Sequence, residues 1–555
     1  MEQFQSHLEA FLYWEKTCPD KPFLIQPLQD GVVKYTYKQA GVEIRRIASA
    51  LKKYNLPKQS HIALLSLNCA HWVMSDIAIM MTGHVSIPIY PTLNAETVKI
   101  ILNHSESKVI IIGKVANYEN IKSAVTDIPK ISVSLYGIND GDSWEKLVAT
   151  NEPLLEFSLP KKEDLITIIY TSGTTGNPKG VMHTVGNFVE SSTVLLNLID
   201  APKNTRSFSY LPLAHVAERI GAMNSLFLGA CISFFHSLET FASDLEKTQP
   251  HIFFAVPRIW CKFQEKILAS IPQKKLDFLL KIPIINGVLK NKLKQKLGLK
   301  ETVYILSGAA PLAKNLVLWF ETIGITIHQV YGMTEDCAIS HFNLVGKNKP
   351  GTVGRALPGV QIKLSDEGEI CIKNNCLMKG YFKAPDITAE VFDEEGYFHT
   401  GDIGEYDDED YLTITGRVKD QFKTDKGKYI SPAPIELEIS KNENIEQICI
   451  VGTGIPQPIA LVTLSEIGKE NSKEIITKSL TLSIKQINPT LEKHEKIEKV
   501  VIIKQDWTIE NGFLTPTLKL KRNHIEKDLK RYYINWFSCK EKIVDDLVQF
   551  NGFPE

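Results

Sequence analysis

Ten consecutive residues in this chain of 555 combine four hydroxyl side chains, three glycines and one lysine. The segment TSGTTGNPKG occupies residues 171–180 and overlaps the end of an apolar run. Glycines let the backbone turn sharply and approach a ligand, while hydroxyls and an ammonium group donate hydrogen bonds to phosphate oxygens. The segment therefore predicts a phosphate-binding loop with the candidate contacts Thr171, Ser172, Gly173, Thr174, Thr175, Gly176 and Lys179.

This segment does not match the nucleotide-binding loop G-x-x-x-x-G-K-[ST]. Pro178 stands five residues after Gly173, and Gly180 rather than Ser or Thr follows Lys179. That other loop also leads directly into a helix. A surface loop after a buried strand is the remaining alternative, because glycine and hydroxyl residues cluster in ordinary loops as well.

Three later segments carry side chains suited to a nucleotide. YGMTE at 331–335 groups an aromatic ring, a hydroxyl and a carboxylate at the end of an apolar run. TGD at 400–402 offers a carboxylate beside a turn glycine, which suits the two hydroxyls of a ribose, and GRVKD at 416–420 adds a guanidinium group. Each segment taken alone is also compatible with a strand end, a turn or a solvated charge cluster.

The elements that must position these segments follow from hydrophobic periodicity. Short apolar runs alternate with longer stretches of helical period, which is typical of buried parallel strands separated by helices. The runs cover residues 61–67, 85–90, 108–113, 166–170, 252–256 and 303–308. The stretches after residue 368 are turn-rich and favour a small barrel or an antiparallel sheet. The prediction is a mixed α/β and α+β protein.

Length and charge limit the class of protein further. A chain of 555 residues exceeds a single core and predicts at least two domains. The formal net charge of −1 gives no sign of a nucleic-acid partner. Nine scattered cysteines without a C-x-x-C pair argue against a disulfide framework and a structural zinc. With neither a signal pattern nor a membrane-spanning apolar run, we expect a cytoplasmic protein.

One segment stands out by its charge. Residues 274–300 hold eight lysines and one aspartate, with apolar residues between them. A basic amphipathic helix on anionic lipid, peripheral at the inner membrane surface, is one interpretation. A solvated helical face that covers the core is the other, and sequence reasoning favours it.

Taken together and in this order, the segments closely resemble the adenylate-forming superfamily. That superfamily contains acyl- and aryl-CoA synthetases, nonribosomal adenylation domains and beetle luciferases. The resemblance runs from about residue 35 to residue 522, and YTSGTTGNPKGV is its most specific signature. Four further stretches resemble the long-chain fatty acyl-CoA synthetase branch: SYLPLAHVAER (209–219), FFAVPRIWCKFQEKI (253–267), the stretch from GEICIKNN to HTGDIG (368–404) and LTPTLKLKR (514–522).

The resemblance implies a fold and a division into domains. An N-terminal domain over residues 1–418 would contain two layered α/β sheets and a small barrel-like lobe, and would bind ATP and the acyl group. A small mobile α+β domain over residues 419–555 would carry the catalytic lysine, with the hinge at Lys419. That lysine is Lys519 by this alignment, with Lys521 as its rival. Leu518 stands where many relatives have Gly.

The resemblance also implies roles for single residues. Tyr331 would stack on adenine, Asp402 would accept from the ribose hydroxyls, and Arg417 would reach the ribose or a phosphate. Glu335 and Thr175 would bind Mg²⁺ and, with Lys519, form the catalytic set. The other implied nucleotide contacts are Gly308, Ala309, Ala310, Gln329, Gly332 and Thr334. His215, Gly332 and Met333 would lie at the acyl pocket, although a structural histidine at position 215 fits the sequence equally well.

The implied activity is ATP-dependent activation of a fatty acid to acyl-AMP, followed by transfer to coenzyme A. ATP, Mg²⁺ and coenzyme A would be required, and the protein would be a monomer or a homodimer. Two alternatives stay open at this stage. An acyl-AMP ligase could deliver the acyl group to a carrier protein, and a homologue without activity could bind lipid.

Overall fold

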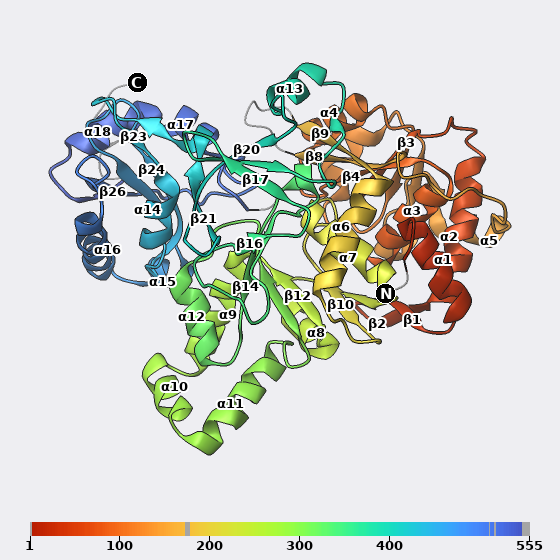
Figure 1. Ribbon diagram of the computed structural model, residues 1–555, viewed down its shortest axis with the longest axis horizontal. Coiled ribbons are helices and arrows are strands. Elements are labelled where there is room, and N and C mark those ends of the chain that lie inside the picture. Colours follow the sequence, from red (N-terminus) through yellow and green to blue (C-terminus); the bar gives the residue numbers. More distant parts are fainter. Residues whose placement is uncertain (1–2, 172–177, 510, 516–517, 547–555) are drawn as a thin grey trace. The chain divides into compact units, whose positions relative to one another are not determined.

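The computed structural model describes residues 3–171, 178–509, 511–515 and 518–546 (Figure 1). The chain forms two compact units. The first consists of residues 1–310, 315–361 and 372–398, and the second of residues 311–314, 362–371 and 399–555.

The first unit contains an eight-stranded sheet, counted over the described residues, in the order β19-β9-β8-β4-β3-β5-β6-β7. Its middle strands are parallel, and β9 and β19 extend it antiparallel at one edge. The bounds are β3 His61–Leu65, β4 Val85–Ile89, β5 Val109–Ile112, β6 Lys130–Ser132, β7 Asp142–Ser143, β8 Leu165–Thr171, β9 Lys179–Thr184 and β19 Gly380–Tyr381.

A second large sheet in this unit has nine strands in the described part of the chain, in the order β16-β15-β14-β13-β12-β10-β11-β1-β2. Its central strands are again parallel. The bounds are β1 Pro22–Leu28, β2 Gly31–Thr36, β10 Arg206–Ser209, β11 Cys231–Phe234, β12 Ile252–Ala255, β13 Tyr304–Ser307, β14 His328–Tyr331, β15 His341–Phe342 and β16 Arg355–Ala356.

One large buried apolar cluster draws residues from both of these sheets and from α1, α2, α3, α6 and α7. Every residue of α3 is buried, so this helix has no solvent face. The helices that lie mainly or wholly in the first unit are α1 His7–Thr17, α2 Tyr37–Lys52, α3 Ala70–Met81, α4 Ala95–Ser105, α5 Trp144–Thr150, α6 Val185–Leu198, α7 Val216–Phe227, α8 Phe241–Thr248, α9 Pro257–Ser270, α10 Gln273–Leu280, α11 Pro283–Lys296, α12 Lys314–Thr322 and α13 Pro385–Glu390.

The second unit is built on smaller sheets. The strands β17 Gln361–Leu364, β18 Glu369–Lys373, β20 Phe398–Tyr406 and β21 Leu412–Arg417 form one sheet in that order. The strands β24 Ile445–Val451, β25 Ile459–Leu464, β26 Lys499–Ile502 and β27 Ile543–Asp545 form another, and β22 Phe422–Lys423 pairs with β23 Tyr429–Ile430. The helices are α14 Pro432–Ile439, α15 Glu466–Glu470, α16 Lys473–Ile487, α17 Arg522–Leu529 and α18 Tyr533–Ser538.

The predicted fold class is confirmed. All six apolar runs form strands, four of them in the eight-stranded sheet and two in the nine-stranded sheet. The lobe expected to be barrel-like is the four-stranded sheet that starts with β17. Among the described residues, no helix has both the length and the apolar composition needed to span a bilayer.

Candidate active site

The strands β8 and β9 hold the two ends of the predicted phosphate loop. Thr171 is the last residue of β8 and pairs with Lys179, the first residue of β9. Residues 172–177 lie outside the described part of the chain, so the predicted contacts of Ser172, Gly173, Thr174, Thr175 and Gly176 stay predictions. The apolar strands on either side therefore fix where this loop leaves the sheet and returns to it.

Glu335 lies in a short 3₁₀ helix, Thr334–Asp336, that follows β14. The buried ring of His183 on β9 holds this helix, because its Nε2 lies 2.7 Å from the carbonyl oxygen of Thr334. Burial lowers the pKa of His183 to about 4. The ring is therefore neutral at pH 7 and can donate its one N–H to this carbonyl.

Tyr381 joins Glu335 to the lysine of the predicted phosphate loop. Its hydroxyl donates to Oε1 of Glu335 at 2.9 Å, and Nζ of Lys179 lies 5.1 Å from the centre of its ring. Burial, followed by the charge of Glu335, raises the pKa of Tyr381, so the hydroxyl keeps its proton as a donor. Tyr381 reaches this position because β19 pairs with β9.

The neighbouring Asp336 is a buried carboxyl group with an incomplete set of partners. Its Oδ1 accepts from the N–H of Met333 at 2.8 Å, while its Oδ2 is buried without a hydrogen-bond partner. Burial raises the pKa of Asp336 to about 7. The folded protein therefore favours the protonated form of this side chain.

We expect Asp336→Asn to remove a pH dependence of stability. In the parent protein the free energy of unfolding should fall as the pH rises from 3.8, the ordinary value for this group, to about 7. The folded state binds more protons than the unfolded state over that range. Unfolding by urea at several pH values measures this slope.

Asparagine retains the acceptor for Met333 but cannot titrate, so the slope of the Asp336→Asn variant should be flatter. Asp30 is exposed, and Asp30→Asn is the matched control that should leave the slope unchanged. Equal slopes for the parent protein and Asp336→Asn would contradict the assignment.

The ends of β13 and β14 place the residues predicted to line adenine. Gly308 follows β13 directly, and a Cβ atom there would lie 2.9 Å from Cγ2 of Val330 on β14. Ala309 has φ +66°, a left-handed conformation that costs energy for a residue with a side chain and that is common at functional sites. Ala310 comes next, at the end of this segment of the first unit.

Gly332 and Gln329 have local structural reasons for their residue types. A Cβ atom on Gly332 would lie 2.5 Å from the backbone carbon of Ala338, so no larger residue fits. Oε1 of Gln329 accepts from the N–H of Gly351 at 3.3 Å. Tyr331 ends β14, and its ring centre lies 6.0 Å from that of His341.

His215 is the N-cap of α7. Its Nδ1 lies 3.3 Å from the N–H of Ala217, within hydrogen-bond distance, and caps the first turn of the helix. This contact supports the structural alternative for His215, and the predicted contact with the acyl group stays a prediction.

In the second unit, two predicted residues contact each other. Asp402 on β20 pairs with Arg417 on β21, and Nε of Arg417 lies 2.7 Å from Oδ1 of Asp402. The carboxylate is buried, while the arginine side chain is about half exposed. Arg417 therefore orients the carboxylate that was predicted to accept from ribose.

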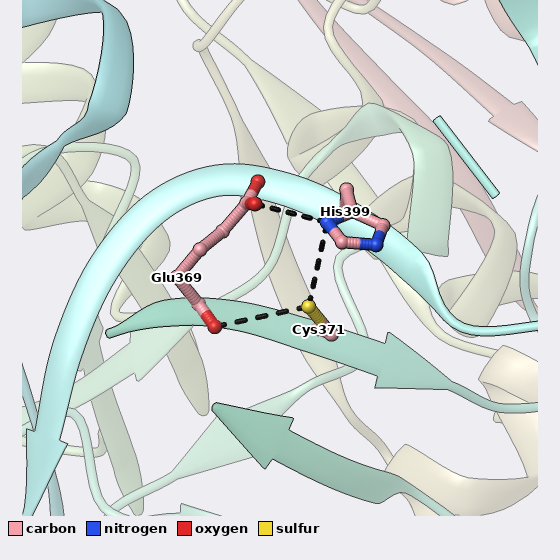
Figure 2. Close-up of side chains that lie close together, drawn as sticks. All are labelled: Glu369, Cys371 and His399. Atoms are coloured by element: carbon pink, nitrogen blue, oxygen red, sulfur yellow. Dashed lines mark hydrogen bonds and ion pairs between the residues drawn. The ribbon is translucent and has the colours of Figure 1, made fainter. Parts of the chain in front are cut away.

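Glu369, Cys371 and His399 form a cluster beside residues 400–402, the segment that carries Asp402 (Figure 2). One carboxylate oxygen of Glu369 lies 2.9 Å from Nδ1 of His399, and the other accepts from the N–H of Gly401 at 2.8 Å. The cluster contains the types of atom that bind Zn²⁺, within 4.8 Å of one another. Because both oxygens of Glu369 already have partners, we interpret the cluster as a brace for the turn that carries Asp402.

Lys519 is held by two hydrogen bonds with Thr515. The N–H of Thr515 donates to the carbonyl oxygen of Lys519 at 2.8 Å, and the N–H of Lys519 donates to the Thr515 hydroxyl at 3.0 Å. Leu518 has φ +61°, the left-handed conformation that glycine adopts most easily. Lys521 instead caps α17, and its N–H donates to the carbonyl oxygen of Phe513.

The fold is that of adenylation domains. The adenylation domain of a carboxylate reductase from Mycobacterium chelonae superposes with a TM-score of 0.82 at 21% identity, covering 97% of this chain and 92% of that one. ATP-bound MatB from Rhodopseudomonas palustris superposes with a TM-score of 0.75 at 20% identity, covering 95% and 99%.

Sequence comparison identifies the family. Residues 11–382 match the AMP-binding enzyme family, and residues 419–531 match the AMP-binding enzyme C-terminal domain. The chain belongs to the AMP-binding enzyme family. It is 29% identical to long-chain-fatty-acid–CoA ligase 5 of Rattus norvegicus, covering 89% of this chain and 82% of that one. It is 30% identical to fatty acyl-CoA synthetase A of Dictyostelium discoideum, covering 89% and 84%.

Sequence reasoning missed three residues that hold predicted segments in place: His183 and Tyr381 in the first unit, and Glu369 in the second. All three lie inside or beside segments that the sequence singled out. Their residue types alone gave no signal, because the partner of each is set by the packing of elements that are distant in the chain. The position of His183 in the apolar strand after the phosphate loop was the one signal that could have been noted.

Proposed function

We propose that this protein activates a long-chain fatty acid with ATP and transfers the acyl group to coenzyme A. A carboxylate oxygen attacks the α-phosphorus of ATP, the bond to pyrophosphate breaks, and acyl-AMP forms. The thiol sulfur of coenzyme A then attacks the acyl carbon, AMP leaves, and the thiol proton passes to solvent. The names of the sequence relatives support the long-chain acid and coenzyme A as substrates.

The observation that carries this proposal is the arrangement of Lys179, Tyr381 and Glu335. The ammonium group of Lys179 lies over the ring of Tyr381, and the hydroxyl of the same tyrosine donates to the carboxylate of Glu335. Transfer at phosphorus depends on cations and dipoles that offset negative charge. Lys179 would bind phosphate oxygens of ATP, with the loop donors Ser172, Thr174 and Thr175 as further proposed contacts.

Glu335 fits the requirements of Mg²⁺. A carboxylate is a hard oxygen ligand, and Mg²⁺ is commonly held by one or two carboxylates together with substrate phosphates. The hydrogen bond from Tyr381 fixes the orientation of this carboxylate. When bound, Mg²⁺ would neutralise phosphate charge, with Glu335 and Thr175 as its proposed protein ligands.

We expect Tyr381→Phe to raise the Mg²⁺ concentration needed for half-maximal pyrophosphate release roughly ten-fold. Loss of a partner that orients a metal ligand typically weakens metal binding by about 10–100-fold. Pyrophosphate release at saturating Mg²⁺ should stay within about three-fold of the parent protein, because Tyr381 is proposed to orient Glu335 rather than react. Titration of Mg²⁺ at fixed ATP measures this.

Tyr118 provides the matched control, since its hydroxyl donates to a carboxylate of Asp140 at 2.7 Å. Tyr118→Phe should leave the Mg²⁺ dependence unchanged. If Tyr381→Phe has the same Mg²⁺ dependence as the parent protein, Tyr381 does not position Glu335 for Mg²⁺ binding.

The remaining roles in the nucleotide and acyl sites are proposed on the family's pattern. Asp402, oriented by Arg417, would accept from ribose hydroxyls, and Tyr331 would stack on adenine. Gly308, Ala309 and Ala310 are the other proposed base contacts, and Gln329, Gly332 and Thr334 are further proposed nucleotide contacts. Gly332, Met333 and His215 would line the acyl pocket.

The domain division proposed here places the boundary between residues 418 and 419. The match to the C-terminal domain begins at residue 419, two residues after the end of β21. Lys419 lies in the short 3₁₀ helix Val418–Asp420, where a change in backbone torsion would turn the small domain. Lys519 would act in the first step, and the small domain would then rotate for thioester formation.

A screen of pyrophosphate release tests the proposal. Carboxylic acids from acetate to oleate are offered with ATP and Mg²⁺, with and without coenzyme A or a carrier protein bearing phosphopantetheine. We expect release with long-chain acids and thioester formation with coenzyme A. Turnover with the carrier alone would favour an acyl-AMP ligase. No release with any acid would favour a homologue without activity.

A further inference from the structure

The helices α10 and α11 form a hairpin that extends away from the rest of the first unit (Figure 1). None of the 14 residues of α11, all of which the structure describes, is buried. The favoured sequence interpretation, a solvated face that covers the core, fits the two ends of residues 274–300, where Leu276, Leu297 and Leu299 are buried, and does not describe α11 between them. A helix in water normally buries an apolar stripe against its own protein.

The base of the hairpin is firmly attached. Leu276 on α10 is fully buried, and Trp319 on α12 donates from Nε1 to Oε1 of Gln273 at 2.8 Å. At the far end of α11, the carbonyl oxygen of Gln295 accepts from Gln249 at 2.9 Å. The apolar residues near the turn of the hairpin are therefore held outward by a fixed base.

Four large apolar side chains are exposed within eleven residues around this turn. The exposed fractions are 64% for Phe278, 83% for Ile284, 39% for Ile285 and 64% for Val288. Ile284 and Val288 are one helical turn apart and so lie on the same side of α11. A concentration of exposed apolar side chains marks a surface that contacts something other than water.

Lysines surround these apolar side chains at helical spacing. Lys274 and Lys281 lie four residues before and three residues after Phe278, and Lys292 lies four residues after Val288. Eight lysines and one aspartate give residues 274–300 a net charge of +7, in a chain whose net charge is −1. Burial and the nearby charge of Lys290 lower the pKa of Lys294, so neighbouring lysines repel one another here.

We propose that this hairpin docks the protein on an anionic lipid surface. Apolar side chains of the turn would enter the interface between headgroups and acyl chains, while the lysine stems extend so that their ammonium groups contact lipid phosphates. Each lysine near an anionic membrane contributes to binding, and the contribution is screened by salt. A surface of this kind would keep the protein where long-chain acids partition.

Sedimentation with vesicles tests the proposal on the full chain. Vesicles of phosphatidylcholine with about one third phosphatidylglycerol are compared with pure phosphatidylcholine at low and high salt. We expect binding to the anionic vesicles that weakens at high salt. Hydrogen exchange on the vesicles should slow within residues 276–292. Failure of the protein to sediment at low salt would overturn the proposal.

A matched pair of variants locates the surface. Ile284→Ser combined with Lys281→Glu should weaken vesicle binding at least ten-fold, because it removes one apolar contact and reverses one charge. Leu155→Ser combined with Lys161→Glu makes the same change elsewhere in the first unit, where Leu155 is 80% exposed. That control should bind as the parent does, and equal losses in both variants would refute the hairpin as the docking surface.

Two readouts separate this proposal from others. Pyrophosphate release with a long-chain acid, measured without vesicles, should be the same in both variants and the parent, so loss of docking and loss of activity are distinguishable. Slowed exchange of the hairpin that grows with protein concentration in the absence of vesicles would assign the surface to a second copy of this chain. That result would overturn docking on lipid.

Discussion

Lys519→Ala is expected to lower the rate of acyl-AMP formation by about 100-fold to 1000-fold, which is the usual effect of removing one preorganised donor at a developing charge. The carboxylate and the α-phosphate of ATP repel each other, and the proposed role of Lys519 is to offset that repulsion. Pyrophosphate release with a long-chain acid measures this step. Thioester formation from supplied acyl-AMP should be spared, because in acyl-AMP the carboxylate is already bonded to the phosphate and the two no longer have to be brought together.

Lys521→Ala is the matched control for this prediction. Lys521 stands two residues further on, where it caps α17 through its backbone. Alanine retains those backbone contacts, so pyrophosphate release should stay close to that of the parent. If Lys521→Ala stops adenylation and Lys519→Ala does not, the two lysines have been assigned in the wrong order.

Asp76→Ala is expected to destabilise the protein by about 3–5 kcal/mol, the usual cost of leaving a buried charge without its partner. Nη2 of Arg219 lies 2.7 Å from Oδ1 and 2.9 Å from Oδ2 of Asp76, and its side chain is fully buried. The hydroxyl of Ser86 accepts from the same nitrogen. Burial raises the pKa of Asp76, and the charge of Arg219 opposes that shift.

Removing Arg219 and removing Asp76 should lower the free energy of unfolding by different amounts. Arg219→Met should destabilise less than Asp76→Ala, because an isolated aspartate can take up a proton whereas an isolated arginine stays charged. Combining Asp76→Leu with Arg219→Met should recover most of the loss. The shift of the first transition in urea unfolding, followed by tryptophan fluorescence, measures each variant.

The surface ion pair of Lys122 and Glu119 shows how much stability is lost when an exposed ion pair is broken, and it is the control for the buried pair. Its side chains are 49% and 79% exposed. Glu119→Ala should change stability by less than about 1 kcal/mol. A loss of similar size for Asp76→Ala would mean that the buried pair does not support the fold.

The buried ion pair of Asp76 and Arg219 also connects the fold to the proposed acyl site. Arg219 lies on α7, the helix that His215 caps, and its guanidinium carbon lies 5.4 Å from the ring centre of Trp72 on α3. Loss of Asp76 should therefore loosen α7 against α3. The motif SYLPLAHVAER thus contains a residue, Arg219, whose role in the structure is to hold this helix in place.

The local features of this protein were predictable from its amino-acid sequence. Apolar runs specified the buried strands, because a short, continuous apolar segment between two helices is buried on both faces when it forms a strand of a parallel sheet. The glycines and hydroxyls between β8 and β9 indicated a loop for phosphate, and the order of the later segments indicated the superfamily. The first two of these properties depend on residues that are neighbours in the chain, and the third depends on the order of short segments along it.

Which distant residues contact one another became visible only in the folded structure. Tyr381 reaches Glu335, 46 residues away, because β19 pairs with β9. Arg219 reaches Asp76 across 143 residues, because α3 and α7 share one core. Strand order and helix packing depend on the summed burial of whole elements, so no short segment contains this information. The sequence therefore predicted the residues of the site, and the contacts that support them required the fold.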